Sequence, residues 1–278
     1  IYNCTNLTIV NIDTVDFSAG VNAFFSNKNL KKVVFSQNVE SIDLFDLYFD
    51  ASSIQTIEVD ENNSVFSSEG GVLFNKDKTK LLYYPEGKET EEYTIPSTVL
   101  YVGDHTLELE GINKAKFTKL NIPASLQSFN NINYLYNCSN LREIVVDSNN
   151  NNFSSQDGVL FNKKKTTLLS YPINKEDTSY VIPSTVTIIG RFAFGNNTNL
   201  TSVTIPTSVN SIYMFAFMDT TSILSITIPS SVISVQPQAF AGWKSNQTIN
   251  IDNTKAYVDS HWDSQWNISN VKVNYLKS

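Results

Sequence analysis

A repeat of 23 residues constrains this chain more than any other feature of its sequence. The block Ile-Pro-Ser-Thr-Val at 182–186 recurs as Ile-Pro-Thr-Ser-Val at 205–209 and as Ile-Pro-Ser-Ser-Val at 228–232. The pair Ala-Phe follows each block at the same distance, at 193–194, 216–217 and 239–240. A unit of this length cannot bury its apolar side chains alone, so it must stack on copies of itself. The spacing therefore predicts a solenoid.

The same register runs through almost the whole chain, in steps of 23 to 27 residues and two steps of 36. Apolar and polar residues alternate over 202–205, which is the pattern of a strand with one buried face. Pro206 has no N–H to donate and ends that strand. We expect a strand-dominated, α/β-type repeat solenoid of about ten rungs, with one long parallel sheet and little regular helix. The ten repeat positions are Ile12, Phe35, Val59, Ile95, Ile122, Val146, Ile182, Ile205, Ile228 and Ile251.

The two long steps lie within a larger duplication. Residues 59–99 match residues 146–186 at an offset of 87, and both copies contain Gly-Val-Leu-Phe-Asn. Each long step carries extra residues, with apolar runs on either side of a short polar turn, and this pattern predicts a β-hairpin. We expect hairpin insertions near 66–84 and 153–171 in a solenoid over 1–252, followed by a C-terminal cap over 253–278.

These residues resemble a known family. The pattern Leu-x-x-[Val/Ile]-x-Ile-Pro-x-[Ser/Thr]-Val, followed by Ala-Phe, is similar to that of the BspA-like leucine-rich repeat surface proteins over nearly all of 1–252. The insertions look like the long repeats of that family. Two rungs depart from the pattern, at Asp46-Leu47 and Thr106-Leu107, where Ala-Phe is expected. The resemblance implies a right-handed leucine-rich-repeat solenoid in a secreted or surface-attached protein that adheres to host matrix or to other cells.

Composition excludes several classes of function. The formal net charge is −7, whereas a protein that binds duplex nucleic acid needs a dense basic stripe to displace counterions. No apolar run approaches the roughly 20 residues of a transmembrane helix. Two Cys and two His offer little material for metal or redox chemistry. The chain begins in mid-rung at Ile1, so we expect further repeats, or a signal and spacer, upstream.

Cys4 and Cys138 occupy the same position in their repeats. They lie five rungs apart, about 24 Å at the spacing of strands, which is far beyond the reach of a disulfide. A nucleophilic thiol would need a nearby imidazole, and neither His105 nor His261 falls in the same rung as a cysteine. We expect two small buried thiols that pack between rungs.

Two oxygen-rich patterns raise the question of a metal. Asp259, His261 and Asp263 alternate, and on a strand they would share a face, but we favour a cap in this region because no second His supports a site. Residues 60–63 and 147–150 are rich in Asp and Asn, yet they lack the ligand spacing and terminal Glu of a calcium loop. Turns closed by Asp and Asn side chains explain these segments better. We expect no metal and no cofactor.

The pattern of acids does not support catalysis. Glycoside hydrolysis needs two carboxylates across a cleft, and Glu58 and Glu143 are the only acids that we expect on the outward strand face. Three rungs separate them, which places them more than about 14 Å apart and outside both hydrolytic geometries. No nucleophile-elbow, zinc-protease, Walker or dinucleotide motif occurs in the sequence. We expect that the protein is not an enzyme.

Two surfaces are candidates for binding. The tips of the insertions form either a pair of basic knobs or, as we favour, solvated turns that brace the solenoid. The tip residues are Lys76, Asp77, Lys78 and Lys80 in one insertion, and Lys163, Lys164 and Lys165 in the other. The outward strand face, which we expect on the concave side of the solenoid, is rich in Ser, Thr and Asn, and this composition predicts weak or multivalent contact. Its candidate residues are Lys119, Asn121, Glu143, Val145, Val181, Ser202, Thr204, Ser225 and Thr227.

The expected function is a monomeric, extracellular or cell-surface module for protein binding or adhesion, with a host matrix or cell-surface protein as its partner. One alternative is a carbohydrate-binding module that stacks sugars on Trp243, Trp262 and Trp266. That alternative requires the three indoles to be exposed. A third interpretation is a spacer that displays another domain.

Overall fold

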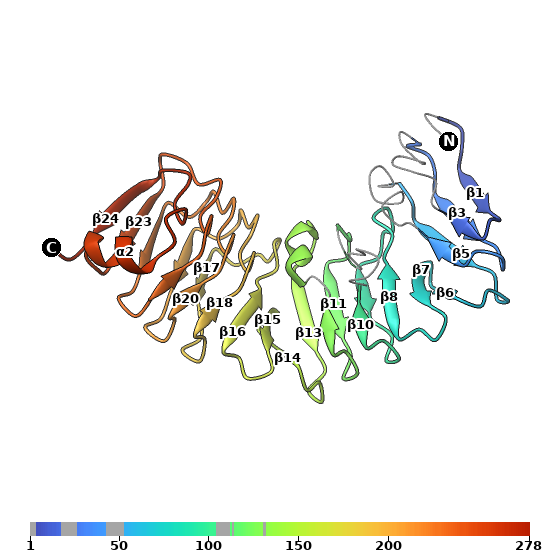
Figure 1. Ribbon diagram of the computed structural model, residues 1–278, viewed down its shortest axis with the longest axis horizontal. Coiled ribbons are helices and arrows are strands. Elements are labelled where there is room, and N and C mark those ends of the chain that lie inside the picture. The colour runs from blue at the N-terminus through green and yellow to red at the C-terminus, as the bar shows by residue number, and fades with distance from the viewer. Residues whose placement is uncertain (1–3, 18–26, 43–52, 104–111, 113, 130–131) are drawn as a thin grey trace. The chain divides into compact units, whose positions relative to one another are not determined.

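The computed structural model describes residues 4–17, 27–42, 53–103, 112, 114–129 and 132–278 (Figure 1). The chain divides into two compact units, Ile1–Tyr134 and Leu135–Ser278. Both units consist of stacked coils of short parallel strands, so the fold is a strand-dominated solenoid of about ten turns with little helix. This confirms the architecture that the repeat predicts.

The strand β19 (Ser202–Thr204) shows how one repeat folds. Val203 is buried, whereas Ser202 and Thr204 on either side of it are exposed, as the alternation predicts. Ile205 is also buried, and Pro206 follows it at the end of the strand. The apolar face of each strand therefore points into the coil, and the small polar residues form its outer surface.

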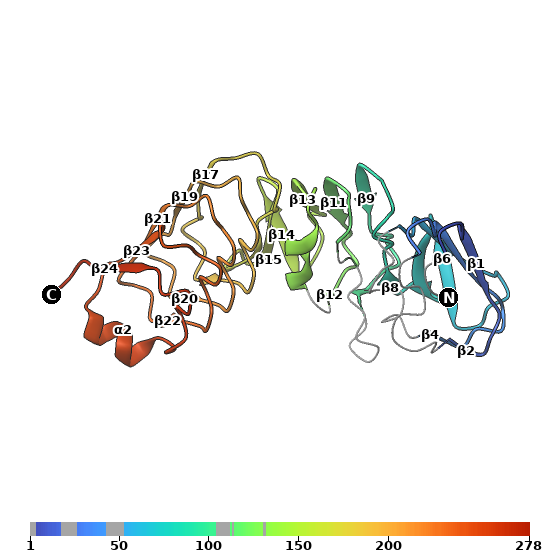
Figure 2. The same ribbon diagram turned by 90° about the horizontal axis from the view of Figure 1, so that it is seen from above.

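The strands of each unit fall into two rows, because a two-residue strand follows the main strand in most turns. In Figure 2 the strands of the two rows in the second unit lie on opposite sides of the coil. The main row of the first unit pairs in parallel as β1 (Ile9–Ile12), β3 (Lys32–Phe35) and β5 (Thr56–Val59), and as β9 (Glu92–Thr94) with β11 (Lys119–Ile122). Its second row pairs β2 (Asp16–Phe17) with β4 (Ser41–Ile42), and β10 (Tyr101–Val102) with β12 (Ser128–Phe129).

The second unit repeats this arrangement. A 3-10 helix, η1 (Ile132–Asn137), lies at the boundary between the units and precedes β13 (Glu143–Val146). The main row continues with β17 (Ser179–Val181), which pairs with β19, and with β21 (Ser225–Ile228), β23 (Thr248–Ile251) and β24 (Lys272–Tyr275). The second row consists of β18 (Ile188–Ile189), β20 (Ser211–Ile212) and β22 (Ser234–Val235). The strands thus form several short sheets where the sequence suggested one long one.

Each insertion is a three-stranded antiparallel meander. The first comprises β6 (Phe66–Glu69), β7 (Val72–Asn75) and β8 (Lys80–Tyr83), and the second comprises β14 (Phe153–Gln156), β15 (Val159–Asn162) and β16 (Thr167–Ser170). The last two strands of each form the expected hairpin. The last strand then pairs in parallel with β10 or β18, so each meander leads into the second row of its unit.

A ladder of aromatic rings fills the centre of the second unit. The rings of Tyr171, Phe194, Phe217 and Phe240 stack in that order, with centroids 5.4, 5.0 and 5.3 Å apart. The three Phe side chains are fully buried, as is the Ala that precedes each of them. Burial of each ring contributes about 2–3 kcal/mol, so the Ala-Phe pair is the main apolar component of its turn.

Buried amide side chains tie successive turns together. Nδ2 of Asn63 donates to the backbone oxygens of Ser36 and Val39 in the preceding turn, at 2.9 and 2.8 Å. Asn197 and Gln247 make equivalent bonds in the second unit. These amides satisfy carbonyl groups that the curvature of the coil leaves without a strand partner.

The two cysteines have different environments. Cys138 is buried, as expected, but Cys4 is exposed, and the expectation of two buried thiols is wrong for it.

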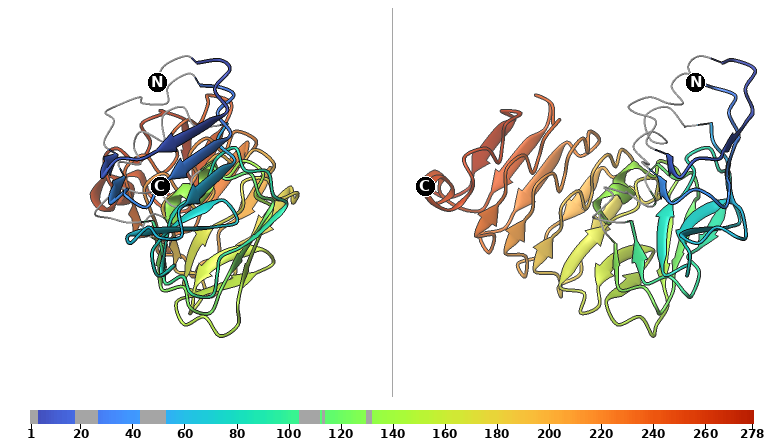
Figure 3. Two further views of the ribbon diagram at one scale, coloured as in Figure 1. Left: turned by 90° about the vertical axis from the view of Figure 1, so that its right-hand side faces the viewer. Right: turned by 45° about the vertical axis from the view of Figure 1, so that its right-hand side comes forward.

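The last turn of the second unit carries the helix α2 (Lys255–His261), which Figure 3 shows beside β24 at that end of the unit. Thr254 is its N-cap, and the Thr254 side chain accepts a hydrogen bond from the backbone N–H of Tyr257. Trp262 and Trp266 follow the helix and are buried, with their rings edge to face at 5.2 Å. The segment from 253 to 278 therefore adds both a strand and a pair of indoles to the last layer of the core.

Candidate functional site

The outward strand face consists of exposed and half-buried side chains in both units. Lys119 and Asn121 belong to the first unit, and the other seven candidate residues belong to the second. Val181 is the most exposed large hydrophobic residue of the described chain, at 69%. The candidates of the second unit that are exposed or half-buried are Glu143, Val145, Val181, Ser202, Thr204, Ser225 and Thr227.

The register of the strands brings part of this face together. Val181 lies beside Thr204 in the β17–β19 pair. On the neighbouring sheet, Nδ2 of Asn250 donates to Oγ of Ser225, at 2.9 Å. These four residues are short hydroxyl, amide and aliphatic side chains, and none of them is an acid or a large aromatic anchor.

A polar hollow of about 760 Å³ lies beside β13 on this face. Glu143 and Val145 of β13 line it, together with the turn between β14 and β15 and the segment 175–177. Gly158 in that turn has a φ of +77°, and a Cβ there would lie 3.3 Å from Cγ of Glu143. The glycine therefore lets the turn approach the glutamate closely.

Charges of both signs surround the hollow. Nη1 of Arg142 lies 2.5 Å from Oε1 of Glu176, and Nζ of Lys175 lies 2.9 Å from Oδ2 of Asp177. Asp157 and Glu143 add two further carboxylates to the lining. Because its side chains are solvated, such a site suits a polar partner and not an apolar small molecule.

The first unit has a comparable hollow of about 490 Å³ over β1, β3 and β5, lined by Asp13, Glu58 and Asp60. Hydrogen bonds from Ser36 and Asn38 lower the pKa of the Asp13 carboxyl. The Asp13 carboxylate is therefore held as a hydrogen-bond acceptor within a polar network.

The sequence suggested that Glu58 and Glu143 are the only acids on the strand face. The structure adds a third, Glu92. Glu92 begins β9 and is exposed, and it lies opposite Lys119 in the strand register. Oε1 of Glu92 lies 3.7 Å from Nζ of Lys119 and accepts a hydrogen bond from Asn121. The alternation around Thr94 could have revealed it, because residues two apart on a strand share a face.

Two of the insertion-tip lysines are bound within their own unit. Nζ of Lys163 donates to the backbone oxygens of Ser148 and Asn150, at 3.1 and 2.5 Å. Lys76 makes the same pair of bonds in the first unit, to the backbone oxygens of Glu61 and Asn63. The ammonium groups thus sit on the Asp- and Asn-rich turns that precede each meander.

The other tip residues differ in the contacts that their side chains make. Lys78 has a φ of 52° and forms an ion pair with Glu69 at 2.5 Å, and Lys165 has a φ of 54° and donates to Gln156 at 2.9 Å. Lys164 and Asp77 are exposed, and Lys80 is half-buried. Most of the basic charge at the tips is therefore already matched by neighbouring oxygens.

The Asp- and Asn-rich turns need no calcium to close them. Oδ1 of Asp60 accepts a hydrogen bond from the backbone of Asn62 at 2.9 Å, and Oδ1 of Asp147 does the same for Asn149 at 2.8 Å. These are the Asx turns that the sequence predicts. Across the described part of the chain, no group of three or more His, Cys, Asp or Glu side chains is arranged to hold a metal ion.

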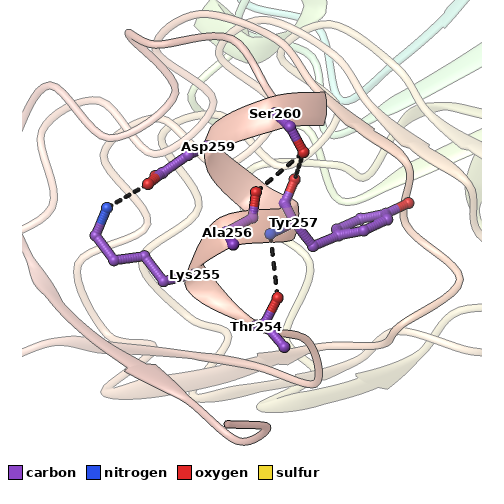
Figure 4. Close-up of polar contacts among 6 residues, drawn as sticks. All are labelled: Thr254, Lys255, Ala256, Tyr257, Asp259 and Ser260. Atoms are coloured by element: carbon purple, nitrogen blue, oxygen red, sulfur yellow. Dashed lines mark hydrogen bonds and ion pairs between the residues drawn. The ribbon is translucent and has the colours of Figure 1, made fainter.

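Asp259 and His261 lie on α2, so they do not alternate along a strand with Asp263 as the metal hypothesis supposed. Figure 4 shows that Asp259 forms an ion pair with Lys255 one helical turn away, at 2.5 Å. Nδ1 of His261 lies 2.9 Å from the backbone oxygen of Tyr257 and 2.8 Å from Oγ of Ser260. The helical geometry thus directs these side chains to partners on their own helix.

The three tryptophans are buried and offer no stacking face to a sugar. Trp243, Trp262 and Trp266 are 3, 7 and 8% exposed. Nε1 of Trp243 donates to the backbone oxygen of Phe217 at 2.8 Å, inside the core. The carbohydrate-binding alternative loses the residues on which it depended.

Three features of the sequence lie outside the described residues: His105 and the irregular positions Asp46-Leu47 and Thr106-Leu107. Among the described residues, no helix has the length and apolar character of a membrane span.

One surface feature is not predicted by the alternation of polar and apolar residues. Phe192 and Phe215 each stand two residues before a core phenylalanine and are only partly buried, and Arg191 lies beside them. Their separation of 23 residues was the available signal, but strand alternation could not place them because they lie in turns.

Comparison with known proteins agrees with this fold. The sequence pattern described as "BspA type Leucine rich repeat region (6 copies)" matches residues 1–75, 86–177 and 173–277. No curated protein matches the chain.

Solved structures of bacterial repeat proteins are similar to it. A leucine-rich repeat protein from Eubacterium ventriosum is 25% identical, with a TM-score of 0.60, over 89% of this chain and 60% of that one. A leucine-rich cell surface protein from Faecalibacterium prausnitzii is 18% identical, with a TM-score of 0.55, over 100% of this chain and 90% of that one. The pneumococcal vaccine antigen PcpA is 14% identical, with a TM-score of 0.51, over 99% and 90%. The chain belongs to the BspA-type leucine-rich repeat family.

Proposed function

We propose that this chain is a non-catalytic, extracellular or cell-surface module that binds a host matrix or cell-surface protein as a monomer. The exposed main row of the second unit is the observation that carries the proposal. Thr204 and Val181 lie side by side there, and β13 of the same unit lines a polar hollow that holds charges of both signs. Such a row offers many weak contacts to a protein surface.

The comparisons supply the second line of support. One structural relative is described as a cell surface protein and another as a vaccine antigen. We carry the surface location to this chain as part of the proposal.

The insertion tips are a weaker alternative for the contact. Lys76 and Lys163 already donate to backbone oxygens of their own units. An arginine or lysine that is bound internally loses those bonds when it turns to a partner. We therefore place the contact on the strand face.

The test is a binding assay of the purified chain against a panel of matrix proteins and glycans at physiological salt. Thr204→Arg places a long charged side chain on the strand face, and Thr221→Arg places the same side chain on an exposed turn as the matched control. We expect saturable binding to a matrix protein, weakened at least about tenfold, or ~1.4 kcal/mol, by the first change only. Equal effects of both changes would refute the proposal that the partner binds the strand face. Absence of binding to every member of the panel would overturn the protein-binding proposal and favour a spacer that displays another domain.

A further inference from the structure

A second row of aromatic rings lies outside the core of the second unit. The ring centroids of Tyr136 and Phe192 are 4.4 Å apart with planes 6° from parallel, and those of Phe192 and Phe215 are 4.8 Å apart with planes at 21°. All three rings are partly exposed. We call Tyr136, Phe192 and Phe215 the outer aromatic row, to distinguish it from the buried ladder.

The backbone of this row is left-handed, with φ of 54° at Phe192 and 59° at Phe215. This conformation costs a residue with a Cβ about 1–2 kcal/mol, and it is rare for bulky side chains. In the next turn the equivalent residue is Gln238, with a φ of 60°. The fold thus accepts a polar side chain at this position, so the backbone of the turn does not require the two aromatic rings.

Arg191 lies beside the outer aromatic row. Its Cζ is 5.2 Å from the ring centroid of Phe192 and 5.7 Å from that of Phe215, within the range of cation–π attraction. The side chain is exposed, and no carboxylate of the described residues lies within ion-pair distance of it. Its N–H donors remain available to a planar anion from outside.

The only other arginine of the chain shows the contrast. Arg142 is also exposed, but its guanidinium is paired with Glu176 at 2.5 Å. Arg191 is thus the arginine that packs against two aromatic rings without a carboxylate partner among the described residues. The protein as a whole has a net charge of −7.

We propose that Arg191 and the outer aromatic row form a docking site for an extended acidic segment of a partner protein. A carboxylate of that segment binds the guanidinium, in the bidentate geometry that suits this pair, while apolar side chains next to it cover the ring edges. Phe192 stacks on a ring at each face, so it has no open face for a sugar. The proposal rests on the proposed function as a protein-binding module and adds a contact of stated chemistry.

The experiment titrates the full chain into a fluorescent short peptide that combines Asp and Glu with Leu and Phe. The same peptide with Asn and Gln in place of the acids is the ligand control, and heparin is the probe for a sulfated glycan. Arg191→Gln removes the charge, and Phe215→Gln copies the residue that stands at 238. Lys244→Gln, which removes an exposed positive charge elsewhere in the same unit, is the matched control, and thermal unfolding checks that each variant remains folded.

We expect the acidic peptide to bind, and the amide peptide to bind at least about tenfold more weakly. Arg191→Gln and Phe215→Gln should each weaken binding by a similar factor, and Lys244→Gln should leave it unchanged. Absence of peptide binding, equal binding of both peptides, equal loss in the Lys244 variant, or binding of heparin in place of the peptide would each overturn the docking site. If Thr204→Arg abolishes matrix binding while Arg191→Gln does not affect either ligand, this site fails and the proposed function stands.

Discussion

Asn197 shows how much one side chain contributes to a turn. It is fully buried, its Nδ2 donates to the backbone oxygens of Pro172 and Ile173, and its Oδ1 accepts from the backbone of Asn199 and Leu200. Asn197→Ala leaves these groups without partners in the interior, so we expect a loss of about 2–3 kcal/mol in the free energy of unfolding. Chemical denaturation measures it.

Asn246→Ala is the control for that prediction, because Asn246 is exposed and its loss should change stability by less than about 0.5 kcal/mol. If both changes have the same small effect, the buried amides do not hold the turns together.

Glu86, also a single residue, makes the free energy of unfolding depend on pH. It is 6% exposed, and Nζ of Lys114 lies 3.4 Å from its Oε1. Burial raises the pKa of the Glu86 carboxyl, and the positive charge of Lys114 only partly opposes this. A raised pKa in the folded state means a contribution to stability that is present below the unfolded pKa and is lost as pH rises through the folded pKa.

We therefore expect Glu86→Gln to stabilise the first unit at neutral pH and to have no advantage below about pH 4, where both states bind the proton. Denaturation of the variant and the parent at the two pH values measures the difference. Glu89→Gln is the control, since Glu89 is exposed. A destabilised variant at neutral pH would show that the ionised pair, and not its burial, dominates.

At the scale of the element, the meanders depend on one lysine each. Lys163 bonds to two backbone oxygens, whereas its neighbour Lys164 is exposed on the same turn. We expect Lys163→Ala to lower the stability of the second unit by about 1 kcal/mol and Lys164→Ala to leave it unchanged. Thermal unfolding of the two variants compares them directly. Equal effects would mean that the ammonium group of Lys163 does not brace the turn.

The repeat predicts the main strands and the core, and the limits of that prediction are physical. The alternation around Val203 and the Ala-Phe pair report burial, and both are confirmed. The first strand of each meander could not be predicted, because polar residues such as Ser154 and Ser155 occupy both of its faces. Polar and apolar residues therefore do not alternate along it. The cluster around Arg191 and Phe192 could not be predicted, because it depends on contacts between side chains of neighbouring turns. Periodicity along the chain carries no information about those contacts.

At the scale of the whole molecule, the described apolar core includes two separate clusters. One extends over residues between Val10 and Tyr83, and the other over residues between Val159 and Val271. In a repeat protein each layer interacts with its neighbours, so a local loss of packing lowers the stability of the nearby layers most. We therefore expect the two clusters to unfold with different free energies.

Ile57→Ala and Ile226→Ala test this independence, because each removes a buried side chain from one cluster only. Each change costs about 2–5 kcal/mol locally. We expect Ile57→Ala to speed amide hydrogen exchange in residues 54–83 and to leave residues 200–251 protected, and Ile226→Ala to do the reverse. Mass spectrometry of peptic fragments resolves the two regions. If either change speeds exchange in both regions, the chain unfolds as one cooperative body, and a partner bound at one unit would then stabilise the other as well.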